Sequence, residues 1–146
     1  MAKISNLTEL TTATDRMEMV INDNNPITKK IKIENLKNSL GLPISFLYGF
    51  ITQSETNAPT MVITHNNFGL VPTFTYNSVG DYTMNFATSV LNDNTLVMLG
   101  TSGNYPYTLQ ATFTNNSEIA LKSFRDNVKY DGGFSSNIPI KIEVYA

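Results

Sequence analysis

The sequence predicts a mainly β protein, with a small N-terminal β-hairpin and a short helix followed by an antiparallel β-sandwich. The first reason is composition, because 18 of the 146 residues are Asn and 18 are Thr. Thr favours strands and Asn favours turns. The second reason is the alternation of apolar and polar residues in many short runs. The third is a cluster of turn-forming residues about every 8 to 15 positions between these runs, a spacing typical of a sandwich.

The hairpin is expected near the beginning of the chain. Residues Met17 to Asn22 have the composition of a strand, and Asp23-Asn24-Asn25-Pro26 follows as a group of turn formers. Ile27, Ile31 and Ile33 then alternate with polar residues, with the period of a half-buried strand. These two runs predict a hairpin whose loop has about four residues.

A short helix is expected directly after the hairpin. Ile33, Leu36 and Leu40 have the spacing that places side chains on one face of a helix. Gly41 suits the left-handed cap at a helix C-terminus, and Pro43 prevents the helix from continuing.

The distribution of aromatic residues predicts a domain boundary near Leu42. All Phe and Tyr residues lie from Phe46 onward, whereas six of the ten Lys and Arg residues precede Leu42. We therefore expect residues 1–42 to form an anchoring or oligomerisation segment and residues 43–146 to form the sandwich. A region of about 40 residues rarely folds alone. It either packs on the second region or completes its core against another chain, and the sequence leaves both alternatives open.

Seven or eight short strands are expected in the second region. In the first of them, Phe46, Tyr48 and Phe50 alternate with residues that are also apolar, so both faces of the strand are apolar. Such a strand lies centrally in a sandwich or against a partner. The other runs with strand character are Met61 to Ile63, Phe74 to Tyr76, Tyr82 to Phe86, Leu96 to Leu99, Leu109 to Phe113, Ile119 to Leu121 and Ile138 to Val144.

No catalytic site and no cofactor are expected. The chain has one histidine, His65, at the end of a predicted strand, and no residue nearby is placed to orient it as a base. Acidic residues such as Asp81 and Glu143 follow turns or alternate outward, which is typical of solvated surface charge rather than of paired catalytic carboxylates. We therefore expect a non-catalytic protein that acts by binding other protein surfaces.

No metal site is expected either. The chain has no cysteine, so that only oxygen ligands and one histidine are available. Asp93, and Asp126 together with Asp131, are the candidates for a calcium ion, but none has the spacing of an EF-hand. Glycines in the chain also form no phosphate-binding loop.

The segment Tyr105-Pro106-Tyr107 lies in a loop rich in Gly and Asn. Exposed tyrosines in loops are good binding groups for proteins and sugars. Tyr105, Tyr107 and Tyr130 are therefore the candidates for contact with a receptor, either a sugar or a protein. Alternatively, Tyr107 simply starts the next strand.

Charge and hydropathy exclude two classes of partner. The net charge of −2 and the pI near 5.3 argue against nucleic acid. No stretch approaches the roughly 18 apolar residues of a membrane span. The first residues also lack the apolar run of a signal peptide. We therefore expect a protein made in the cytoplasm that leaves the cell, if it does, as part of a larger particle or by lysis.

Three groups of residues in the first 40 positions form a recognisable pattern: Ile4-Ser5-Asn6-Leu7-Thr8, then Asp15 with Met19-Val20-Ile21, and then the run from Thr28 to Leu36. With this pattern, the segment resembles the N-terminal segment of bacteriophage fibre and virion proteins. In that family the segment looks like a mounting piece, followed by a variable β domain. The runs Gly80 to Phe86 and Ile138 to Tyr145 resemble, more weakly, the C-terminal domains of phage structural proteins.

The resemblance implies a virion component, a homotrimer that acts as a head fibre or a short tail fibre or adaptor. Its partners would be other copies of itself and other virion proteins on the capsid or tail. The alternatives are a receptor protein that binds a host glycan or protein and, less favoured, a depolymerase with two nearby carboxylates. The candidates for virion contact are Ile4, Leu7, Leu10, Met19, Ile21, Ile31 and Leu36.

Overall fold

The structure is a computed structural model of the chain, and it describes residues 18–21, 29–101 and 107–146, with side chains from Asn35 onward. The chain divides into two compact units, Met1–Leu42 and Pro43–Ala146. No helix in the described ranges has the length and apolar composition needed to cross a membrane.

The first unit contains a hairpin and a helix, as the sequence predicts. Strand β1 (Glu18–Ile21) pairs antiparallel with β2 (Lys29–Lys32), and Met19 lies opposite Ile31. Helix α1 (Ile33–Ser39) follows β2 directly. A two-stranded sheet and a seven-residue helix are each marginal as isolated elements in water.

The helix ends at the predicted glycine. The backbone amide of Leu42 donates to the carbonyl of Lys37 at 3.0 Å. Gly41 has φ 64°, the left-handed conformation that glycine adopts without steric cost. Leu36 is half-buried, whereas Leu40 lies beyond the last helical residue and is 62% exposed. The predicted helical face therefore loses its last member.

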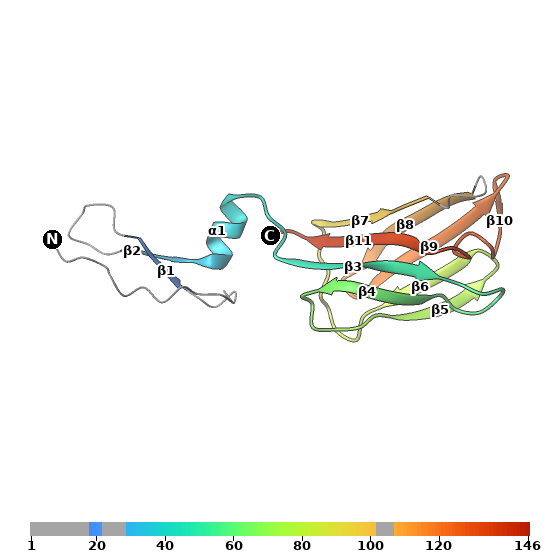
Figure 1. Ribbon diagram of the computed structural model, residues 1–146, viewed down its shortest axis with the longest axis horizontal. Helices are drawn as coiled ribbons and strands as arrows, with labels where there is room; N and C mark the ends of the chain where they lie inside the picture. The colour runs from blue at the N-terminus through green and yellow to red at the C-terminus, as the bar shows by residue number, and fades with distance from the viewer. Residues whose placement is uncertain (1–17, 22–28, 102–106) are drawn as a thin grey trace. The chain divides into compact units, whose positions relative to one another are not determined.

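The second unit is a sandwich of two antiparallel sheets, visible in Figure 1. One sheet has the strand order β4-β3-β11-β7. In the other, β5, β6 and β9 lie in that order, and β8 and the short β10 also pair with β9. The strands are β3 (Ser45–Thr52), β4 (Thr60–Asn66), β5 (Thr73–Ser78), β6 (Asp81–Asn85), β7 (Thr95–Leu99), β8 (Tyr107–Asn115), β9 (Glu118–Arg125), β10 (Val128–Lys129) and β11 (Ile138–Val144). Each predicted run of this unit coincides with a strand, except that Phe86 follows the end of β6. The predicted fold class is confirmed.

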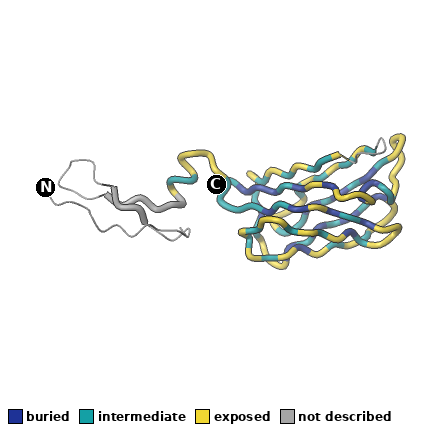
Figure 2. The backbone as a smooth tube through the Cα atoms, in the orientation of Figure 1, coloured by how far each residue is buried: buried dark blue, intermediate teal, exposed yellow. Residues whose placement is uncertain are grey.

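The core lies between the two sheets, because alternate residues of each strand point inward. Figure 2 shows this alternation as short buried stretches along the strands. The first strand, β3, is central, between β4 and β11. The buried apolar residues of the core are Leu47, Ile51, Tyr82, Met84, Phe86, Leu91, Ile119, Leu121, Phe134, Ile138, Ile140, Ile142 and Val144. Both sheets contribute to this list, so neither sheet can be removed without exposing the other.

The sandwich has two ends that differ in their loops. Ser45 at the start of β3 pairs with Val144 at the end of β11, so the chain enters and leaves the sandwich at the same end, here called the proximal end. The β3–β4 and β5–β6 connections and the segment around β10 lie at the opposite, distal end (Figure 1).

The sequence analysis did not predict strand β10. The two residues between β9 and β10, Asp126 and Asn127, have φ values of 52° and 64°. Two successive left-handed residues form the tight turn that matches the twist of a hairpin, and Asp and Asn tolerate this conformation. The dipeptide Asp-Asn was therefore the local signal for this hairpin.

Candidate functional site

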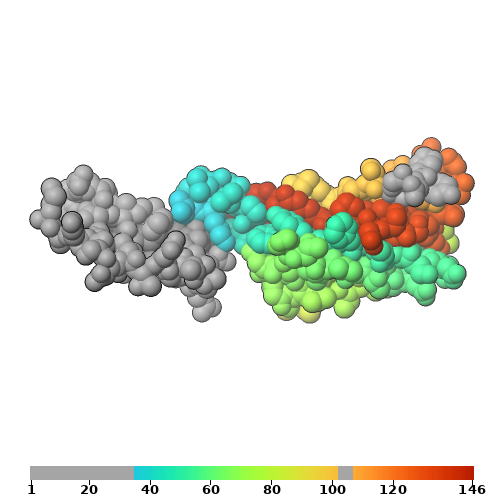
Figure 3. Space-filling view, viewed as in Figure 1, coloured from blue at the N-terminus to red at the C-terminus, as the bar shows by residue number. Residues whose placement is uncertain are grey.

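The outward side of the sheet β4-β3-β11-β7 is rich in aromatic and aliphatic side chains. Phe50 lies between Val62 and Pro139 in the strand registers. Phe50 is 39% exposed and Val62 63% exposed, and on β7 Leu96 is 44% and Met98 41% exposed. Figure 3 shows this side, with β3, β4 and β11 in the middle of the sandwich. We call it the aromatic face, and its apolar members are Phe46, Tyr48, Phe50, Val62, Leu96, Met98 and Pro139.

Rings pack against one another at the centre of the aromatic face. Phe46 and Tyr48 stack with their centroids 5.0 Å apart and an interplanar angle of 25°. The ring of His65 lies 6.1 Å from that of Tyr48, and the Nζ atom of Lys141 lies 5.3 Å from the Tyr48 centroid. These contacts hold Tyr48 in one orientation.

Glu143 lies on the same face but is only 5% exposed. Its Oε1 accepts a hydrogen bond from Tyr48 Oη at 2.6 Å and pairs with Lys141 Nζ at 2.9 Å. Its Oε2 accepts a hydrogen bond from Tyr145 Oη at 3.0 Å. The prediction that Glu143 is a solvated surface charge is therefore wrong. It points outward, as the alternation predicts, but Tyr48, Lys141 and Tyr145 cover it.

These contacts fix the ionisation states within the cluster. Burial disfavours the charged carboxylate, but hydrogen bonds from Tyr48, Lys141 and Tyr145 outweigh this and hold the pKa of Glu143 below its usual value. The hydrogen bond to Glu143, with burial, raises the pKa of Tyr48 to about 12. The pKa of Tyr145 is raised for the same reasons. At neutral pH the face thus holds one ion pair, Lys141–Glu143, whose charges cancel.

The outward side of the other sheet has a different chemistry. Asn77 Nδ2 donates to Thr83 Oγ1 at 2.9 Å, and Asn85 Nδ2 donates to Thr75 Oγ1 at 3.1 Å. Side chains of this kind hydrogen-bond to water and to one another. We call this side the polar face, and its polar members are Thr73, Thr75, Asn77, Asp81, Thr83, Asn85, Thr108, Gln110, Thr112, Thr114, Glu118 and Lys122.

A second cluster lies at the distal end, around Asp131. The Oδ1 atom of Asp131 accepts hydrogen bonds from the Gly80 amide at 2.6 Å and from Tyr82 Oη at 2.8 Å, and Oδ2 accepts one from Tyr76 Oη at 3.1 Å. Burial, and the bond to Asp131, raise the pKa of both Tyr82 and Tyr76. These tyrosines are therefore neutral donors that tie β5 and β6 to the segment after β10.

Gln53 connects this cluster to the β3–β4 loop. Its Nε2 atom donates to Tyr82 Oη at 2.8 Å and to the carbonyls of Glu55 at 2.8 Å and Asn57 at 3.2 Å. Its Oε1 atom is buried and has no hydrogen-bond partner in the part of the chain that the structure describes. A cavity of about 310 Å³ lies beside it, lined by Thr52, Gln53, Ser54, Asn57, Ala58 and Thr60.

A second cavity of about 300 Å³ lies at the same end, between the β3–β4 loop and the segment after β10. Its lining combines carboxylates, hydroxyls and one aromatic ring, which are groups that hold polar ligands. Asp131, however, already accepts the three hydrogen bonds described above. The lining residues are Glu55, Thr56, Val79, Tyr130, Asp131, Gly132 and Ser135.

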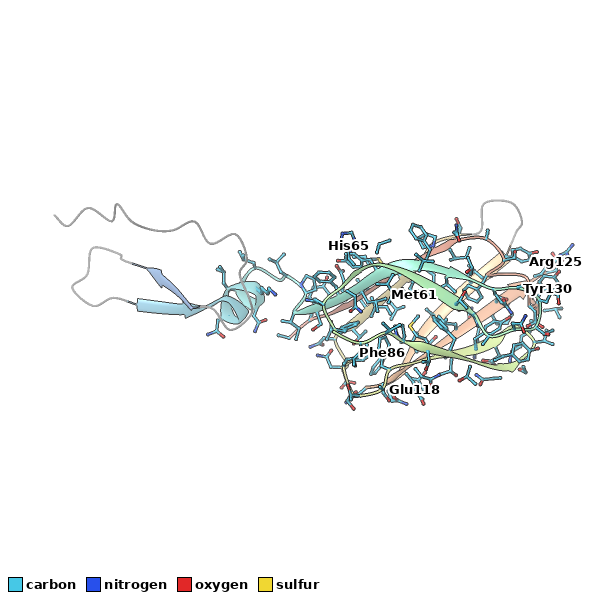
Figure 4. The ribbon with its side chains drawn as sticks, turned by 60° about the horizontal axis from the view of Figure 1, so that its bottom comes forward. Met61, His65, Phe86, Glu118, Arg125 and Tyr130 are labelled. Atoms are coloured by element: carbon cyan, nitrogen blue, oxygen red, sulfur yellow. The ribbon has the colours of Figure 1, made fainter. Side chains whose placement is uncertain are left out.

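The fold brings together two of the three predicted receptor contacts. The rings of Tyr107 and Tyr130 stack with centroids 5.6 Å apart and an interplanar angle of 12°. The guanidinium carbon of Arg125 lies 5.6 Å from the Tyr130 centroid, and Figure 4 shows Arg125 and Tyr130 together at the distal end. Tyr107 also begins β8, as the alternative prediction holds. Tyr105 lies outside the described residues.

Three of the predicted virion contacts, Met19, Ile21 and Ile31, lie on the strands of the β1–β2 hairpin. Leu36 is half-buried on α1. The side chains of the other six candidates lie outside the described part of the chain: Ile4, Leu7, Leu10, Met19, Ile21 and Ile31.

The predicted metal candidates lie in separate places. Asp93 is exposed in the loop before β7, Asp126 lies in the turn before β10, and Asp131 belongs to the tyrosine cluster. Within the described ranges, no group of three or more His, Asp or Glu side chains is placed to hold a metal ion. His65 is exposed on β4 beside Tyr48.

Comparisons with protein families, with curated proteins and with solved structures found no match to this chain. Its function must therefore be argued from its own residues. The sequence analysis missed the roles of Glu143, Asp131 and Gln53, because their partners lie far away in the chain. It did contain a signal for the aromatic face, since both faces of the run from Phe46 to Ile51 are apolar.

Proposed function

We propose that the chain is a non-catalytic structural protein of a bacteriophage particle, a head fibre or a short tail fibre or adaptor. In this proposal, residues 1–42 dock on another virion protein of the capsid or tail. Residues 43–146 are displayed as a compact β domain, and three copies act together.

The observation that carries the proposal is the inequality of the two units. The second unit has its own core of thirteen buried apolar residues. The first unit, in its described part, has a four-residue hairpin pair and a seven-residue helix. Elements of this size need a further surface to be stable. The resemblance of this segment to phage mounting segments supports a virion protein as that surface.

The chemistry of the described clusters also supports a binding role. Asp131 and Glu143 hold their tyrosine neighbours through hydrogen bonds, and the pKa values of Tyr48, Tyr76, Tyr82 and Tyr145 are raised, away from neutral pH. General acid–base groups are instead usually poised near the working pH. These clusters fit a structural role in holding strands and loops together.

The test is whether the protein is part of the particle and is attached through its first unit. Phage particles whose genome encodes this chain should contain the protein, and mass spectrometry of the purified particles should detect it. The double variant Met19→Asp/Ile31→Asp, which changes two residues opposite each other in the hairpin, should lose binding to particles that lack the protein. The matched control is Glu18→Ser/Lys32→Ser, which changes the neighbouring residue pair of the same hairpin. This control protein should still bind the particles and sediment with them. A chain found only in the cell lysate would contradict the proposal.

A second candidate function is binding of a host receptor, such as a surface glycan, at the distal end. The stacked pair Tyr107–Tyr130 beside the cavity of about 300 Å³ favours it. Aromatic faces and hydroxyl groups are suited to the apolar and polar sides of a sugar ring. Tyr130→Ala should then weaken binding of the full chain to host cells at least about tenfold, and Thr112→Ala on the polar face should not. Equal binding by both variants would exclude this candidate.

A further inference from the structure

We infer that the aromatic face is the surface through which copies of this chain meet one another. The inference deepens the proposed function, since it names the surface that holds several copies together. The partner is a second copy of this chain, and closure of the ring of copies would place the same face of each copy toward a common axis.

The first argument is the apolar surface that a single copy leaves exposed. Four large apolar side chains of one sheet are each more than a third exposed: Phe50 on β3, Val62 on β4, and Leu96 and Met98 on β7. Phe50 and Val62 pair on β3 and β4, and Leu96 and Met98 lie on β7, opposite Glu143 and Lys141 of β11. Exposed apolar groups gathered in this way on one side of a sheet often mark an interaction site. Phe, Tyr and Met are also the residues enriched at the centres of protein interfaces.

The second argument is charge. Lys141 and Glu143 pair with each other at 2.9 Å within the face, and Tyr48 and Tyr145 complete the hydrogen bonds of the carboxylate. A surface that carries its own neutralised ion pair can approach an identical surface without repulsion between like charges. A partner of strong charge would find no complementary charge here. The face thus favours a neutral partner, and an identical copy is one.

The third argument is the length of the connection between the two units. Five residues lie between the end of α1 at Ser39 and the start of β3 at Ser45. Fully extended, they span about 20 Å. If the first units of several copies are held together on the particle, their β3 strands stay at a high effective concentration. Strand β3 is central in the sheet that carries the aromatic face, and it supplies Phe46, Tyr48 and Phe50.

The polar face provides the matched comparison. Its sheet also has four strands of at least five residues, besides the short β10. Its edge strands β5 and β8, however, present Thr73 and Thr112 where β4 and β7 present Val62 and Met98. If any outward face of a sandwich could hold copies together, the polar face and the aromatic face would mediate association equally well. Association through burial of apolar surface would use the aromatic face alone.

The first experiment measures the mass of the full chain in solution by light scattering over a range of concentrations. The wild-type chain should have three times the chain mass of 16.2 kDa. The variant Val62→Lys/Met98→Lys places two charges on the edge strands of the aromatic face and should dissociate to single copies. The variant Thr73→Lys/Thr112→Lys adds the same charges to the edge strands of the polar face and should keep the wild-type mass. Circular dichroism of all three proteins checks that they are folded.

A second experiment does not depend on a variant that disrupts association. The chain has no cysteine, so a single introduced cysteine reports on one position. Met98→Cys should react with a thiol reagent at least about tenfold more slowly than Thr112→Cys, although both positions are accessible in an isolated chain. Equal reaction rates at the two positions would overturn the inference.

The outcomes separate this inference from the proposed function. A wild-type chain with the mass of one copy would overturn the inference, and so would an oligomer whose mass survives Val62→Lys/Met98→Lys. In the second case the copies would be held together elsewhere. Attachment to the particle is measured independently, through Met19→Asp/Ile31→Asp, so that attachment and association through the aromatic face can each fail while the other stands.

Discussion

The two outward faces of the sandwich are made from strands of similar length, and yet they carry different kinds of side chain. The polar face is a ladder of Thr and Asn side chains that bond to one another, such as Asn77 to Thr83. The aromatic face exposes Phe50 and Val62. It also buries a carboxylate, that of Glu143, which lies between Phe46 and Leu96 in the strand registers. The inward sides of both sheets, by contrast, are mostly apolar, and Ser123 on β9 is a buried polar exception.

The difference fits the inference that only one of the two faces meets another protein. A polar face needs only water, so threonine at alternate positions satisfies both the strand and the solvent. On the aromatic face, burial of the Glu143 carboxylate costs free energy of desolvation, although its hydrogen bonds offset part of that cost. A sheet that only faces water has no need of such a buried charge. That cost is consistent with a surface that meets another protein and holds one geometry when it does.

The largest effects are expected on the inward sides, where the two sheets should behave alike. Ile142 and Leu121 are each fully buried, one in each sheet. Ile142→Ala and Leu121→Ala should each lower the free energy of unfolding by about 2–5 kcal/mol, because both leave cavities in the shared core. Urea unfolding at one fixed protein concentration measures this. If either variant were tolerated, the two sheets would not share one core.

The ion pairs of the two faces should contribute unequally to stability. Glu143→Gln replaces a buried carboxylate that has three partners, and we expect the free energy of unfolding to fall by about 1–3 kcal/mol. Asp81 pairs with Lys129 at 2.7 Å on the other sheet, with side chains 23% and 43% exposed. Asp81→Asn should therefore cost less than about 1 kcal/mol. Equal losses, measured by thermal unfolding, would mean that Glu143 is no more important than a surface charge.

The same carboxylate predicts a dependence on pH. The pKa of Glu143 is lower in the folded chain than its ordinary value, so the ionised form stabilises the fold at neutral pH. This stability should be lost as the pH falls below about 4.3, the ordinary pKa of Glu, and through the lower folded value. A plot of unfolding free energy against pH should be flatter in that range for Glu143→Gln than for the wild type. Parallel curves would contradict the assignment.

The smallest effect is expected on the polar face. Thr112 is exposed on β8, and Thr112→Val keeps a β-branched side chain on the strand. The free energy of unfolding should change by less than about 0.5 kcal/mol, and the mass in solution should not change. A change above about 1 kcal/mol in chemical unfolding would show that the polar face makes contacts beyond those with water and its own side chains.

Much of the fold could be predicted because its signals are local. The alternation in Ile138 to Val144 predicts a strand whatever its neighbours are, since successive side chains of a strand point to opposite sides. Gly41 marks the end of α1 for a similar reason, because few other residues adopt its φ of 64°. The dipeptide Asp126-Asn127 was as local a signal and could have revealed β10.

The candidate sites could be predicted only in part, because they depend on which strands become neighbours. The run from Phe46 to Ile51 suggested a central strand or one that meets a partner. Strand β3 is central, and Phe50 on its outer side remains exposed. Tyr107 and Tyr130 were each chosen from local composition, but nothing in the sequence placed their rings in contact.

The sequence by itself determined where strands and turns lie, which side chains share a side of each strand, and the absence of cysteine chemistry. Only the tertiary structure decided that Glu143 is buried, because Tyr48, which covers it, is 95 residues away in the chain. It likewise decided that one outward face is apolar and the other polar, since a face is assembled from four strands. The physical reason is that side-chain alternation follows from the geometry of one strand, whereas burial depends on the pairing of strands that are distant in sequence.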